Sequence, residues 1–80
     1  MSKILKRPIF VRMKGDLPQS IFFRGKWLWV EEIMEQWRET GRWWENEVER
    51  DFFLIQTGVG GFLLYRENST YKWVLYKALD

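Results

Sequence analysis

The chain has 80 residues with six tryptophans, six phenylalanines and three tyrosines, but it has no cysteine and no histidine. This composition excludes a disulfide framework, a cysteine nucleophile and a Ser-His-Asp triad, and it argues against a zinc site. The net charge of +2 is unevenly placed: residues 1–30 carry seven Lys or Arg and one Asp, and residues 31–51 carry three Arg and eight Asp or Glu. Such asymmetry indicates a surface that binds nucleic acid or an acidic partner. The alternative is that the two segments lie side by side and neutralise each other.

The length predicts one domain, because 80 residues suffice for a single small core. We expect a flexible basic tail at residues 1–6 and a single small β domain over residues 7–80. No apolar run approaches the ~20 residues of a membrane span. The N-terminus lacks the long apolar region of a secretory signal, and the absence of cysteine fits a reducing compartment, so we expect a cytoplasmic protein.

Short apolar runs bounded by turn residues dominate the chain and predict strands. In the first, Ile9, Val11 and Met13 share one face, while Phe10, Arg12 and Lys14 share the other. The last three runs are joined by two short turns, which predicts a meander. The expected strands are residues 9–14, 20–24, 27–30, 50–57, 62–66 and 71–77.

Residues 31–39 allow two interpretations. Val30, Ile33, Met34 and Trp37 recur at helical spacing, which favours a short helix and an α+β fold. The alternative is a strand with a bulge near residues 31–32, after which Ile33, Glu35 and Trp37 would share one face. Unpaired strand edges promote aggregation, and closing a small sheet into a barrel removes these edges. We therefore predict a mainly β fold: a small, antiparallel, barrel-like sheet of five to six strands.

The chain contains the motifs Phe23-Arg24-Gly25-Lys26, Trp29-Val30, Trp37-Arg38-Glu39, Gly41-Arg42-Trp43-Trp44, Arg50-Asp51-Phe52-Phe53, Leu64-Tyr65-Arg66, Trp73-Val74-Leu75 and the final Asp80. With these motifs, residues 8–80 resemble a family of small, uncharacterised bacterial domains, which stand alone or occur with proteins related to Y-family (translesion) DNA polymerases. The resemblance implies a link to DNA repair but no catalytic residue. It also favours the bulged strand over the helix at residues 31–39.

No residue pattern predicts an enzyme, a cofactor or a metal site, so we expect a non-catalytic binding module. The first hypothesis is a single-stranded nucleic-acid interface, where bases stack on aromatic rings beside basic side chains, with single-stranded DNA or a DNA-repair protein as partner. The alternative is that the two tryptophans of this hypothesis, Trp27 and Trp29, fill the core. The residues of this hypothesis are Arg7, Arg12, Lys14, Arg24, Lys26, Trp27 and Trp29.

The second hypothesis is a protein-interaction module, a peptide groove or adaptor anchored by exposed Trp and Arg. Its candidates are Arg42, Trp43 and Trp44, which follow a turn predicted at Thr40-Gly41. Adjacent residues of an extended segment point to opposite sides, so this pattern places one of the two tryptophans toward solvent. The alternative is that both close one end of the barrel.

Overall fold

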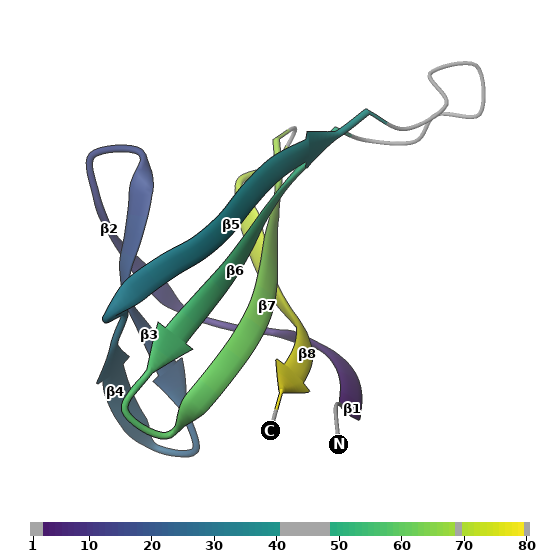
Figure 1. Ribbon diagram of the computed structural model, residues 1–80. Coiled ribbons are helices and arrows are strands. Elements are labelled where there is room, and N and C mark those ends of the chain that lie inside the picture. The colour runs from purple at the N-terminus through teal and green to yellow at the C-terminus, as the bar shows by residue number, and fades with distance from the viewer. Residues whose placement is uncertain (1–2, 41–48, 69, 80) are drawn as a thin grey trace.

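The computed structural model describes residues 3–40, 49–68 and 70–79 of the chain. These residues form two antiparallel sheets, a five-stranded sheet in the order β1-β8-β7-β6-β5 and a three-stranded sheet in the order β2-β3-β4 (Figure 1). The strands are β1 (Lys3–Pro8), β2 (Val11–Lys14), β3 (Leu17–Phe23), β4 (Lys26–Trp29), β5 (Glu32–Glu39), β6 (Arg50–Thr57), β7 (Gly60–Glu67) and β8 (Lys72–Leu79). The predicted mainly β, antiparallel fold is confirmed, but the expected single sheet of five to six strands is wrong, because the described residues form eight strands in two sheets. No described residue lies in a helix that could cross a membrane.

The chain passes between the two sheets at two corners. At one corner, the Ile9 amide donates to the Trp73 carbonyl at 3.2 Å, and the Phe22 amide donates to the Phe10 carbonyl at 2.9 Å. At the other, the Val30 and Glu31 amides donate to carbonyls of β3 and β6, respectively. The described strands thus form two sheets joined at two corners, and their closure into one barrel remains a prediction.

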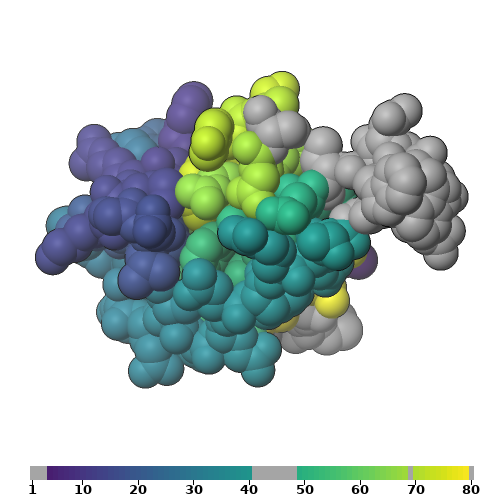
Figure 2. All heavy atoms as spheres, turned by 90° about the horizontal axis from the view of Figure 1, so that it is seen from above, coloured from purple at the N-terminus to yellow at the C-terminus, as the bar shows by residue number. Residues whose placement is uncertain are grey.

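The core lies between the sheets because the inner-facing apolar residues of both sheets meet there. Ile21 of β3 is fully buried against the five-stranded sheet. In Figure 2 the purple and blue N-terminal strands lie directly against the yellow-green C-terminal strands. Burying these side chains removes apolar surface from water at about 25 cal/mol per Å², which is the main stabilising term in a chain without disulfides. The buried cluster consists of Ile21, Phe53, Ile55, Phe62, Leu64 and Leu75.

The helix alternative for residues 31–39 is wrong, because Glu32–Glu39 forms β5 and pairs with β6. Pairing with β6 satisfies the backbone and stacks Trp37 on Phe52, with ring centroids 5.3 Å apart. A bulge is present, but it lies between Ile33 and Glu35 rather than near residues 31–32. Ile33 therefore pairs with Ile55 on the core side, whereas Trp37 pairs with Phe52 on the opposite side, so the expected shared face is also wrong.

The segment expected to be a flexible tail is sheet from Lys3 onward. β1 pairs with β8, with Ile4 opposite Lys77, and Leu5 packs against the core. A register shift follows Ile4, and Lys6 has a positive φ of 47°. This irregularity breaks the alternation by which a strand is recognised from sequence. Residues 1–2 lie outside the described residues.

Gly60 begins β7 with a φ of +136°, a region that L side chains rarely adopt. A Cβ there would lie 3.4 Å from the Leu79 carbonyl oxygen, an ordinary contact distance, so the cost of a side chain comes from the backbone conformation. Replacing Gly60 with alanine is expected to lower the free energy of unfolding by about 1–3 kcal/mol, measured by urea denaturation. Gly61→Ala is the matched control, since its Cβ would make only ordinary contacts. Equal effects of the two substitutions would contradict this account of Gly60.

Candidate binding surfaces

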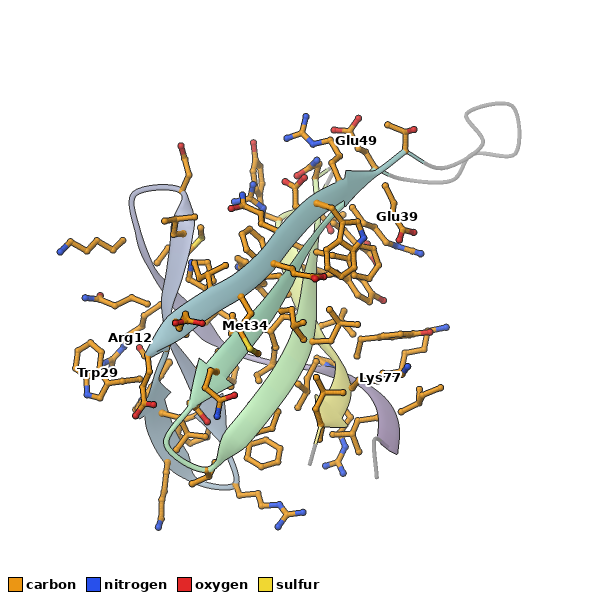
Figure 3. All side chains as sticks on the ribbon, in the orientation of Figure 1. Arg12, Trp29, Met34, Glu39, Glu49 and Lys77 are labelled. Atoms are coloured by element: carbon orange, nitrogen blue, oxygen red, sulfur yellow. The ribbon has the colours of Figure 1, made fainter. Side chains whose placement is uncertain are left out.

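The outer face of the three-stranded sheet carries an exposed aromatic surface. Its residues, called the aromatic face below, are Phe10, Arg12, Phe22, Trp27 and Trp29. Strand register brings them together, because Ser20 of the central strand pairs with both Arg12 and Trp29, and Phe22 pairs with Trp27. Figure 3 shows Arg12 and Trp29 next to each other at the outer side of this sheet.

Three of the four rings on this face contact one another, because Phe22 meets both Phe10 and Trp27, with the Phe10 ring centroid 6.5 Å from that of Phe22. Phe22 meets Trp27 edge to face at 5.2 Å, and the Arg12 guanidinium carbon lies 4.0 Å from the centre of the Trp27 ring. Trp29 and Phe10 are freer, with 67% and 73% of their surface exposed. A flat ligand would therefore meet Trp29 and Phe10 first, because the Arg12 guanidinium lies over the Trp27 ring.

The predicted nucleic-acid residues are all exposed, but they do not form one group. Arg12, Trp27 and Trp29 come together on the aromatic face, and the alternative that these tryptophans fill the core is wrong, since Trp27 is 38% exposed. The others lie apart from this face: Lys14 is at the far end of β2, Arg24 and Lys26 are at the β3–β4 turn, and Arg7 is on β1.

Sequence reasoning missed Phe10 and Phe22 as candidate ligand contacts. The alternation in residues 9–14 already placed Phe10 beside Arg12 on the outward face, so this signal was present. Phe22 lies in the run Ile21-Phe22-Phe23. Because all three residues are apolar, the sequence does not indicate which of them face the core and which face solvent. The residues of the protein-interaction hypothesis, Arg42, Trp43 and Trp44, lie outside the described residues.

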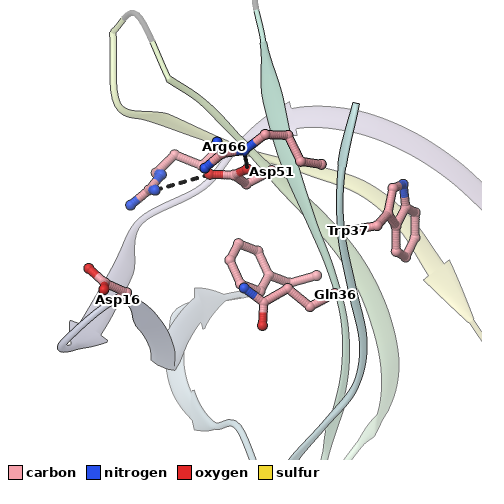
Figure 4. A pocket seen from close by; sticks show the side chains of 7 residues that line it. Asp16, Gln36, Trp37, Asp51 and Arg66 are labelled. Carbon is pink, nitrogen blue, oxygen red and sulfur yellow. Dashed lines mark hydrogen bonds and ion pairs between the residues drawn. The ribbon is translucent and has the colours of Figure 1, made fainter. Parts of the chain in front are cut away.

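A second feature is an ion-pair cluster centred on Asp51 of β6, which is only 7% exposed. Arg38 donates from Nε to one carboxylate oxygen at 2.7 Å, and Arg66 donates from Nη2 to the other at 3.2 Å (Figure 4). Arg38 also pairs with Glu49 at 3.3 Å. The three side chains come together because strand register places Asp51 opposite Arg38 on β5 and opposite Arg66 on β7.

The two arginines set the ionisation of Asp51. Burial, the largest single effect, raises the pKa of its carboxyl, but hydrogen bonds and charges from Arg38 and Arg66 together outweigh burial and hold the pKa below the ordinary value. In turn, the hydrogen bond to Asp51 raises the pKa of Arg38. The Nε of Arg66 is buried and has no hydrogen-bond partner among the described residues. Leaving a buried donor unpaired costs about 1–3 kcal/mol, which makes the bond from Arg66 to Asp51 more important for stability.

This cluster forms one wall of a pocket of about 530 Å³ between the β2–β3 turn and the five-stranded sheet. Asp16 lies across from Arg66, and Gln36 lies below them (Figure 4). Phe53 also lines the pocket. Both oxygens of Asp51 are committed to arginines, so it positions Arg38 and Arg66 and is not available as a base. The described residues contain no group of three or more acidic side chains placed to hold a metal ion.

Comparison with known proteins identifies a family. Residues 2–80 match a family model described as a domain of unknown function (DUF6504). No curated protein and no solved structure matches the chain. The match covers nearly the whole chain and supplies no activity.

Proposed function

The chain belongs to the DUF6504 family of domains of unknown function, and from this premise we propose that it is a non-catalytic module that binds single-stranded nucleic acid on the aromatic face. The observation that carries the proposal is the exposure of Trp29 and Phe10 beside Arg12 on one sheet surface. Folding alone does not account for such exposure, because large rings contribute most to stability when buried.

Single strands are the form of nucleic acid that suits this surface. Their bases have free faces that stack on aromatic rings, at about 1–3 kcal/mol per base, whereas the bases of a duplex are already stacked on each other. Arg12 can pair with a phosphate while its guanidinium remains over Trp27. The seven basic residues in 1–30 add a field that attracts the backbone.

The proposal includes a biological setting, which the family resemblance supports. The ligand is single-stranded DNA exposed during repair in a bacterial cytoplasm, where the module acts as an accessory to translesion polymerases. In the proposed barrel-like arrangement, the backbone hydrogen bonds at the two corners join the three-stranded sheet, which carries the aromatic face, to the rest of the fold.

Titration of a fluorescein-labelled oligothymidine into the full chain tests the proposal. Stacking and phosphate contacts together predict binding at about 50 mM salt that weakens steeply by about 200 mM, as counterion release requires. An unlabelled hairpin duplex should compete poorly. Absence of binding at the lower salt concentration would reject the proposal. Salt-independent binding would instead favour the aromatic face as a protein contact, since Trp and Arg also anchor such interfaces.

A further inference from the structure

The end of the molecule that carries the β3–β4 turn contains a pocket with a different character from the aromatic face. The pocket has a volume of about 520 Å³ and lies between the two sheets, where the β3–β4 and β6–β7 turns and the end of β8 meet. Its principal lining residues are Arg24, Lys26, Leu28, Val59, Phe62 and Leu79. Lys26 is opposite Phe23 of β3, and Phe23 packs against the core. Lys26 therefore lies on the inner face of the three-stranded sheet and not on the aromatic face.

The charges of this pocket are of one sign. Arg24 and Lys26 are both exposed, and no acidic side chain among the described residues lines the pocket. Neither cation takes part in the ion pairs formed among the described residues. Two unneutralised cations beside an apolar surface favour a ligand that presents carboxylates next to an apolar group.

The accessible apolar part of the pocket is mainly aliphatic. Its one half-buried ring, Phe23, is already occupied, because it packs on Phe62 with ring centroids 5.0 Å apart and the Arg24 guanidinium carbon lies 5.1 Å from its centre. Val59, at the tip of the β6–β7 turn, is 66% exposed, and Leu28 and Leu79 are half-buried, whereas the Phe62 ring is almost fully covered. Thr57 holds this turn, because its hydroxyl accepts from the Val59 amide at 3.2 Å and donates to the Gly60 carbonyl at 2.9 Å. Aliphatic side chains offer no ring for a base to stack on, so the pocket suits an aliphatic side chain better than a nucleobase.

The edge of β4 next to this pocket offers backbone hydrogen-bonding groups to a ligand. In the sheets formed by the described residues, β4 pairs only with β3, so its other edge can accept an extended segment. We propose that this pocket binds an acidic, extended peptide segment of a partner protein, with an aliphatic side chain between Leu28 and Val59 and carboxylates paired with Arg24 and Lys26. This surface is separate from the aromatic face, so a partner and a nucleic-acid strand could be held at the same time.

An array of short synthetic peptides, probed with the labelled full chain, tests the proposal. The expected result is retention of peptides that combine Asp or Glu with Leu, Ile or Val. The strongest binder is then titrated by fluorescence anisotropy against Lys26→Glu and Arg24→Glu, each expected to weaken binding by about tenfold. Val59→Ser should also weaken it.

Two control variants test whether peptide binding is confined to this pocket. Lys72→Glu reverses a charge on β8 that is also exposed but lies outside this pocket, and Trp29→Ala alters only the aromatic face; both variants should bind the peptide as the unsubstituted chain does. Circular dichroism of each variant verifies folding. The proposal is overturned if the array retains no peptide, if it retains only basic or uncharged peptides, or if both charge reversals leave the affinity unchanged.

Discussion

Replacing Asp51 with asparagine is expected to lower the free energy of unfolding by about 3 kcal/mol, the typical loss when one partner of a buried ion pair is removed. The substitution keeps the shape of the side chain but leaves Arg66, whose side chain is 18% exposed, without the anion that balances its charge. Arg38 is 59% exposed and can be hydrated, so the loss arises mainly from Arg66. Urea denaturation at neutral pH measures it. Asp16→Asn, which alters an exposed carboxylate of the same pocket, should change stability by less than about 0.5 kcal/mol.

The same substitution should change the response to acid. The folded-state pKa of Asp51 lies below its ordinary value of 3.8, so the stability that this carboxylate contributes is fully present above that value. It is lost as the pH falls through the lower, folded-state pKa. The difference in stability between the unsubstituted chain and Asp51→Asn should therefore shrink below about pH 4. An unchanged difference under acid conditions would show that the variant is destabilised by altered packing and not by lost charge.

Trp29→Ala is expected to weaken oligothymidine binding by about tenfold, which corresponds to the loss of one stacked base. Because Trp29 is mostly exposed and does not belong to the buried cluster, the free energy of unfolding should stay near that of the unsubstituted chain. Trp27→Ala should reduce binding and also release Arg12, which lies over its ring. The measurement is fluorescence anisotropy at low salt, with unfolding followed in parallel.

Met34→Ala provides the control for this prediction. Met34 is an exposed apolar residue of β5, outside the aromatic face, so its loss should leave oligonucleotide binding unchanged. Equal weakening by Met34→Ala and Trp29→Ala would indicate non-specific contact with apolar surface. Full affinity in Trp29→Ala would remove Trp29 from the interface.

The C-terminal half of the fold was readable from sequence. The strand predicted at residues 50–57 coincides with β6, and the next two predictions fall within β7 and overlap β8. These strands are consecutive, and turn residues separate them: Gly58 lies between β6 and β7, Gly60 begins β7, and Asn68 lies between β7 and β8, so local signals suffice. The two corners and β1 were not predicted. β1 is a strand because it pairs with β8, which is distant in the sequence, so no local pattern indicates it.

The candidate sites were predictable only in part, for the same reason. Trp27-Leu28-Trp29-Val30 is apolar on both faces, so alternation cannot tell which face is outward. The direction is decided by Leu28, which packs against the core and leaves both tryptophans outside. The meeting of Arg38, Asp51 and Arg66 depends on the register of three strands, which no local pattern specifies.

The central claim is that the aromatic face contacts nucleic acid, and tryptophan indole resonances in a ¹H–¹⁵N correlation spectrum test it most directly. The six tryptophans give six indole N–H signals that single substitutions can assign. Addition of oligothymidine at low salt should shift the signals of Trp27 and Trp29 and leave those of Trp37 and Trp73 in place, because the latter two pack against Phe52 and Phe53 on the five-stranded sheet. Unchanged Trp27 and Trp29 signals at a saturating oligonucleotide concentration would contradict the claim.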